Sequence, residues 1–206
     1  MPLRINLDDR HLHRSLAPHT LYKPASFLRC GILTNSERYR QQEPDIEIGF
    51  LTVDYLSRSY LPLEDAIIVD AGIIPTTSFI QQLKMLREGE FLTCMNTIIA
   101  QCGDQQIHEK TIDSQLYTLQ NRWDLPKLNA EITLLDYQQI THGRVSADLP
   151  SHCRIIGPKE MFFMEQGAIA IDATFNTTNG PIYLAANSEI MEGSMIRGPF
   201  SLGERS

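Results

Sequence analysis

Asp70 is the acidic residue of this sequence that is best placed to do chemistry. It ends the run Ala66–Val69 (AIIV), which is apolar and mostly β-branched, and it is followed by Ala71 and Gly72. Strands buried on both faces have this composition, and α/β proteins bind ligands just beyond the carboxyl ends of such strands. A carboxylate there can hold Mg²⁺ against phosphates, although an aspartate at a strand end is also a common turn or capping residue.

Charged residues nearer the N-terminus are of the kinds that phosphate transfer needs. Lys23 and Arg29 are the cations that would neutralise charge developing on phosphates, and the alternative is that both are solvated surface charges. Asp8 and Asp9 follow the alternating apolar and polar residues of Leu3–Leu7. They either line the same cleft as Asp70 or form an Asx turn after the first strand.

Amide and imidazole groups supply two more candidate sites. Asn96 lies within the apolar stretch 90–102 (EFLTCMNTIIAQC), where its side chain could hydrogen-bond a base or a ribose. His11, His13 and His19 form a cluster in the sequence, but a zinc site there lacks a fourth ligand. We therefore expect these three residues to be polar surface histidines.

The elements that must hold these residues alternate between strand and helix patterns over the first 150 residues. Strands are expected at residues 3–7, 46–51, 66–69 and 90–102. Helices are expected after an N-cap at Asn35 or Ser36 and after another at one of residues 76–78. A third helix is expected to end at Gly143, after a linker that begins at Leu125. This order predicts an α/β layer with some parallel strand pairing.

Composition limits the class of protein. The chain has 206 residues, 42% of them hydrophobic, which is enough for a main domain and a small appendage. Its net charge of −7 argues against nucleic acid or an anionic membrane as a partner. No apolar run approaches the roughly 18 residues of a membrane span, and the N-terminus does not resemble a signal peptide. Four widely spaced cysteines without a C-x-x-C pair indicate reduced thiols and a cytoplasmic location.

A period of six residues marks the C-terminal part of the chain. The apolar positions of this repeat are Leu184, Ile190, Ile196 and Leu202. Ser188 and Ser194 fill the small position that follows each of the first two, and Phe200 breaks the pattern in the third unit. Repeats of this kind predict a parallel β-helix, in which each unit lays down one short strand. An antiparallel meander would also permit a spacing of six, but it would require alternating apolar residues between these positions.

The last coil of a β-helix must be covered by a cap or by another chain. Nothing that resembles a cap follows Leu202, so we expect the sequence to be a piece of a longer protein whose coils continue. The uncovered coil also favours self-association, and we expect a homo-oligomer formed through the β-helix.

Several sequence blocks together resemble the GlmU-like sugar nucleotidyltransferases. The most specific blocks are IIGPKEMFF, GPIYL and EIMEGSMIRGPF, and LDDRHLHRSLAPHTLYKP, LTVDYL and RWDLPKLNAEI agree in the same order. The resemblance covers nearly the whole chain. It implies a nucleotidyltransferase-like α/β domain over residues 1–150 and the first coils of a left-handed parallel β-helix over residues 151–206.

The resemblance also implies an activity and its site. Members transfer a nucleotidyl group from a nucleoside triphosphate to a hexose 1-phosphate, which gives a nucleoside diphosphate sugar and pyrophosphate. Asp70 falls where related enzymes keep a metal-binding aspartate, so Mg²⁺ is the implied cofactor. Lys23 falls at the basic position of the family's Thr-Arg-Pro triplet, here Tyr-Lys-Pro, and Lys23 and Arg29 would serve catalysis. Asp8, Asp9, Lys23 and Asn96 would then bind the nucleotide.

Two departures from the family pattern support a different function. The segment LRINLDDRHLHRSLAP contains no glycine, whereas related enzymes have a glycine-rich phosphate loop there. Lysine also cannot make the bidentate contact that an arginine makes with a phosphate. The alternative is therefore a catalytically inactive module that binds a sugar nucleotide or serves assembly. An acyltransferase histidine would lie in later coils, because no histidine follows His152.

Overall fold

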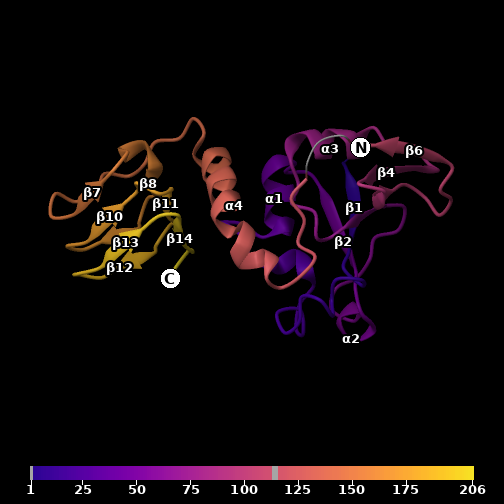
Figure 1. Cartoon of the computed structure of the whole chain (residues 1–206), viewed down its shortest axis with the longest axis horizontal. Coiled ribbons are helices and arrows are strands. Elements are labelled where there is room, and N and C mark those ends of the chain that lie inside the picture. The colour runs from indigo at the N-terminus through magenta and orange to yellow at the C-terminus, as the bar shows by residue number, and fades with distance from the viewer. Residues whose placement is uncertain (1, 113–115) are drawn as a thin grey trace. The chain divides into compact units, whose positions relative to one another are not determined.

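The computed structural model describes residues 2–112 and 116–206, and the chain divides into two compact units (Figure 1). Unit 1 comprises the chain up to Arg29 and Thr34–Leu125, and unit 2 comprises Cys30–Leu33 and Pro126–Ser206. The domain boundary near residue 150 stays a prediction from the sequence. Among the described residues, no helix is both long enough and apolar enough to cross a membrane.

The described part of unit 1 is built on a six-stranded mixed sheet with the order β2-β1-β3-β5-β4-β6. The strands are β1 (Arg4–Asp8), β2 (Glu47–Leu51), β3 (Ile67–Asp70), β4 (Glu90–Cys94), β5 (Thr97–Gln101) and β6 (His108–Thr111). β1 pairs in parallel with β2 and β3, whereas β5 is antiparallel to β3 and β4. The predicted α/β layer and its first three strands are thus confirmed.

The helices described in unit 1 are η1 (Ala25–Phe27), α1 (Asn35–Gln42), α2 (Asp54–Ser57) and α3 (Thr77–Lys84). Of these, α1 and α3 begin at side-chain caps. Thr34 and Glu37 form a reciprocal capping box at α1, so the expectation of Asn35 or Ser36 as the cap was wrong by one or two residues. At α3 the Thr76 hydroxyl accepts a hydrogen bond from the Phe79 amide, which confirms a cap within residues 76–78.

The stretch 90–102 is a hairpin rather than a single strand. β4 and β5 are joined by Met95 and Asn96, whose φ angles are +48° and +62°. Positive φ at both central residues is typical of a tight two-residue turn between antiparallel strands. The expectation of one strand was wrong because this turn carries no glycine, which is the usual sequence signal for it.

The alternation of residues along β1 and β3 separates the core from the site. Ile5, Leu7 and Val69 are fully buried on one face, in a core that also contains Phe79 and Leu83 of α3. Because successive side chains of a strand point to opposite faces, Asp8 and Asp70 project from the other face.

Unit 2 opens with most of α4 (Asp124–Thr141), the longest helix of the described chain. The expected linker from Leu125 is instead the first turn of this helix. Pro126 is tolerated there because the first N–H groups of a helix have no intrahelical acceptor. The helix ends at Thr141, just before Gly143, as the sequence predicts.

Residues 151–206 of unit 2 form parallel sheets only. Their strands are β7 (Arg154–Ile156), β8 (Phe162–Met164), β9 (Ile169–Ala170), β10 (Thr174–Asn176), β11 (Ile182–Leu184), β12 (Glu189–Ile190), β13 (Met195–Arg197) and β14 (Phe200–Leu202), with the short helix η2 (Lys159–Met161) before β8. Within this range the sheets are β13-β10-β7, β14-β11-β8 and β12-β9, so consecutive strands enter the three sheets in turn. The parallel registers exclude the antiparallel meander for these strands.

The apolar side chains of the six-residue repeat point into the space between these sheets. Leu184 and Ile190 are buried there, and Ile196 and Leu202 pack against the same apolar cluster. Phe175 is fully buried at its centre.

Unit 2 also holds a short segment from the first part of the chain. Asn129 Oδ1 accepts a hydrogen bond from the Gly31 amide at 2.8 Å. Asp136 Oδ2 accepts one from the Ile32 amide at 2.8 Å and one from the Leu33 amide at 3.0 Å. Gly31 has φ +83°, and an added Cβ would lie 2.6 Å from Asp136 Oδ2, so this position requires glycine.

Replacing Phe175 with alanine should destabilise unit 2 by about 3–5 kcal/mol, because it removes a fully buried ring and leaves a cavity. Urea unfolding followed by circular dichroism measures the change. Met195→Ala is the control, since that side chain is 88% exposed and its loss should cost less than about 0.5 kcal/mol. Equal unfolding free energies for the two variants would contradict the prediction.

Candidate functional site

The candidate site lies at the carboxyl ends of β1 and β3. These strands pair in parallel, and the register sets Asp8 of β1 directly beside Asp70 of β3. Both residues line a pocket of about 230 Å³, together with His11 and residues of β5. The sequence therefore placed Asp70 correctly at a strand end that borders a pocket.

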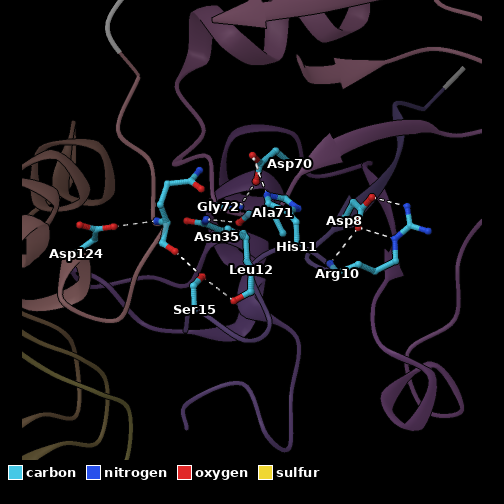
Figure 2. A network of polar contacts seen from close by, with 11 residues as sticks. Asp8, Arg10, His11, Leu12, Ser15, Asn35, Asp70, Ala71, Gly72 and Asp124 are labelled. Atoms are coloured by element: carbon cyan, nitrogen blue, oxygen red, sulfur yellow. Dashed lines mark hydrogen bonds and ion pairs between the residues drawn. The ribbon is translucent and has the colours of Figure 1, made fainter. Parts of the chain in front are cut away.

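Asp8 is held by the residue two positions later (Figure 2). Asp8 Oδ1 accepts hydrogen bonds from the Arg10 amide at 3.1 Å and from Arg10 Nε at 2.9 Å. Asp8 Oδ2 lies 2.6 Å from Arg10 Nη2. This bidentate contact raises the pKa of the Arg10 guanidinium above its ordinary value.

Asp70 is held from two sides and is 9% exposed. Its Oδ1 accepts a hydrogen bond from the Gly72 amide at 2.8 Å, and its Oδ2 lies 3.4 Å from His11 Nε2 (Figure 2). The hydrogen bond to Asp70 raises the pKa of His11, although partial burial of the ring acts in the opposite direction. The segment after β1 thus supplies one basic side chain to each of the two carboxylates.

The turn that follows Asp70 is tied to three other segments. The Ala71 amide donates to the Asp8 carbonyl at 3.0 Å, and the Leu119 amide donates to the Gly72 carbonyl at 2.8 Å. The Asn35 side chain binds the turn from α1. Gly72 has no room for a side chain, because an added Cβ would lie 2.6 Å from the Leu119 carbonyl oxygen.

Asp9 points away from this pocket and is 0% exposed. Its amide donates to the Leu51 carbonyl at 3.0 Å, and its Oδ2 accepts a hydrogen bond from the Ala25 amide at 2.6 Å. In the structure Asp9 therefore fastens η1 to the end of β1. Nucleotide binding by Asp9 stays a prediction.

The other predicted residues lie outside the lining of the pocket. Lys23 is half-buried, with Nζ 5.3 Å from the centre of the Tyr22 ring. Arg29 is exposed, with Nη2 3.3 Å from Glu37 Oε1. Asn96 is exposed in the turn between β4 and β5, next to Thr97, which does line the pocket. The roles of Lys23, Arg29 and Asn96 stay predictions.

Sequence reasoning missed three residues of the site, namely Arg10, His11 and Asn35. A sequence signal existed for the first two, because Arg and His directly follow a pair of aspartates at a strand end. His11 was expected to be a surface histidine, and it is half-exposed but paired with Asp70. Asn35 carried no signal, since its partners lie on a different element.

The fold and the site together define an α/β protein with a pocket at the carboxyl end of its parallel strands. Comparison with protein families agrees with this class. The sequence profile of the family described as sugar nucleotidyl transferase matches residues 5–145, and the chain therefore belongs to that family. The match confirms the resemblance at the level of the sugar nucleotidyltransferases, and it includes Asp8 and Asp70. No curated protein matches the chain in sequence.

Replacing Gly72 with alanine should destabilise unit 1 by about 1–3 kcal/mol, because the new Cβ overlaps the Leu119 carbonyl oxygen and approaches Leu12 Cδ1 at 3.0 Å. Thermal unfolding measures the effect. Gly203→Ala is the control, since its Cβ would meet only Ser206 Oγ at 3.5 Å. A Gly72→Ala protein as stable as the wild type would show that the three segments do not converge tightly on this turn.

Proposed function

We propose that the protein transfers a nucleotidyl group from a nucleoside triphosphate to a hexose 1-phosphate. A phosphate oxygen of the sugar phosphate attacks the α-phosphorus, the bond between the α-phosphorus and the bridging oxygen breaks, and pyrophosphate leaves. The products are a nucleoside diphosphate sugar and pyrophosphate. The observation that carries the proposal is the pair of carboxylates, Asp8 and Asp70, at adjacent strand ends in a chain of the sugar nucleotidyl transferase family.

The donor set at this edge fits Mg²⁺. Among the described residues, no group of three or more His, Cys, Asp or Glu side chains is arranged to hold a metal. Mg²⁺ does not require such a group, because it is usually bound through one or two carboxylates together with water and substrate phosphates. Asp70 and Asp8 would hold the ion, which would offset negative charge on the phosphates when bound.

The chain's basic residues have two roles in the proposal. Arg10 and His11 balance the charge of the two carboxylates and hold their orientation. Lys23 would bind phosphate as a point charge and Arg29 through its guanidinium, in place of the backbone amides of a glycine-rich loop. Asn96 would complete the nucleotide site, because its neighbour Thr97 lines the pocket. Asp9 would act on the site indirectly, through its bond to the Ala25 amide.

We extend the proposal to unit 2 as the start of a left-handed parallel β-helix. Support comes from the strictly parallel pairing over residues 154–202 and from the order in which the chain visits the three sheets. In this proposal further coils carry acyltransferase-type chemistry, the β-helix makes the protein a homo-oligomer, and the protein acts in the cytoplasm.

A second candidate function is a catalytically inactive module that binds a sugar nucleotide or serves assembly. The specific observation in its favour is that both carboxylates already have basic partners within the chain, Arg10 for Asp8 and His11 for Asp70. The absence of glycine from the segment after β1 agrees with it.

Replacing Asp70 with asparagine should lower the rate of pyrophosphate release by roughly two orders of magnitude, because the shape is kept and the charge that holds the metal is lost. Nucleotide affinity without metal should hardly change. Lys23→Ala should instead weaken triphosphate binding itself. The assay follows pyrophosphate release from a panel of nucleoside triphosphates and hexose 1-phosphates, with and without Mg²⁺.

The matched control for this assay is Asp54→Asn, which removes an exposed carboxylate on α2. It should release pyrophosphate at the wild-type rate. If the wild type binds a nucleotide but releases no pyrophosphate with any pair of substrates, the transferase proposal is wrong. The inactive binding module then takes its place.

A further inference from the structure

Asn35, the first residue of α1, binds the turn that follows Asp70 through its buried side-chain amide. We infer that Asn35 is a positioning residue that orients Asp70 for the metal and substrate phosphates of the proposed reaction. The role in metal and phosphate binding rests on the proposed function. The positioning of Asp70 by Asn35 rests on hydrogen bonds within unit 1. Figure 2 shows Asn35 next to Ala71 and Gly72, on the route from α1 to Asp70.

Asn35 binds two carbonyl groups on either side of Gly72. Its Nδ2 donates to the Ala71 carbonyl at 3.0 Å and to the Ile73 carbonyl at 3.0 Å. The side chain is 1% exposed, so water cannot replace these bonds if the amide is removed. Both protons of the amide are thus used to fix one three-residue turn.

A buried arginine sets the orientation of this amide. Arg38 lies one turn later on α1 and is also 1% exposed. Its Nη1 donates to Asn35 Oδ1 at 2.9 Å. Because a guanidinium can only donate, the oxygen of the amide must face Arg38 and the nitrogen must face the turn. A fully buried arginine is rare unless it is paired, and Arg38 meets this requirement in part through Asn35.

The turn at residues 71–73 also fixes the Asp70 carboxylate. With the carbonyls of Ala71 and Ile73 held, the peptide of Gly72 has a defined plane, and its amide points at Asp70 Oδ1 at 2.8 Å. Oδ1 of Asp70 therefore accepts a hydrogen bond from the backbone, and Oδ2 faces His11. Asp70 and His11 both line the pocket. Groups that orient a metal ligand from behind commonly change metal affinity by about 10–100-fold when they are removed.

Two variants of Asn35 test the inference. Asn35→Asp keeps the shape and the acceptor for Arg38, but it removes both donors and places a carboxylate against two carbonyl oxygens. Asn35→Ala removes the whole contact. The control is Asn6→Ala, because Asn6 is another buried asparagine with two backbone hydrogen bonds, at 2.9 and 2.8 Å to Leu63, outside this turn.

The first measurement is amide hydrogen exchange, which needs no activity. In both Asn35 variants, exchange within residues 71–74 should be faster by about tenfold relative to residues 90–94 of β4 in the same sample, as expected for the loss of one or two hydrogen bonds. Asn6→Ala should leave this ratio unchanged. If the ratio in both Asn35 variants equals that of the wild type, the turn does not depend on Asn35 and the inference is overturned.

The second measurement is the affinity for Mn²⁺ in the absence of substrates, determined from the relaxation rate of water protons. The variant Asp70→Asn shows whether the ion binds at Asp70. The Asn35 variants should bind Mn²⁺ at least tenfold more weakly than wild type, whereas Asn6→Ala should stay within twofold. If the wild type binds through Asp70 and the Asn35 variants bind equally well, the inference fails and the proposed function stands. If Asp70→Asn binds Mn²⁺ as tightly as the wild type, the metal role of Asp70 and the role of Asn35 both fail.

Discussion

The parallel pairing of β1 with β3 is the constraint on which the site depends. It sets Asp8 beside Asp70 at the same edge of the sheet, and the alternation of each strand sends both carboxylates to the face opposite the core. Two neighbouring anions repel each other, and an opposite charge close by offsets the energy of this repulsion. The segment after β1 supplies that charge through Arg10, which pairs with Asp8, and through His11, which adds positive charge beside Asp70 when its ring is protonated.

The same edge of the sheet explains how a site forms without a glycine-rich loop. A glycine-rich loop presents backbone amides to phosphates. In this chain the residue after β1 is Asp9, whose carboxylate accepts a hydrogen bond from the Ala25 amide. That contact is fully buried, so the Ala25 amide is satisfied within the chain.

Local patterns in the sequence were sufficient for much of this fold. The β-branched run before Asp70, the threonine cap of α3 and the six-residue repeat depend on neighbouring residues, and the structure agrees with each. The hairpin at Asn96 was missed because two non-glycine residues adopt positive φ there. Asn35 and His11 were missed because their partners are distant in sequence, and pairings of that kind are decided by the sheet order rather than by local preference.

The capture of Cys30–Leu33 by α4 has a consequence for how the chain is made. These residues emerge early in synthesis, but Asn129 and Asp136, which satisfy their amides, emerge about one hundred residues later. Until then the three amides of residues 31–33 lack these acceptors. Because Cys30–Leu33 belongs to unit 2, its hydrogen bonds to α4 cannot form during synthesis on the ribosome until that helix has been translated.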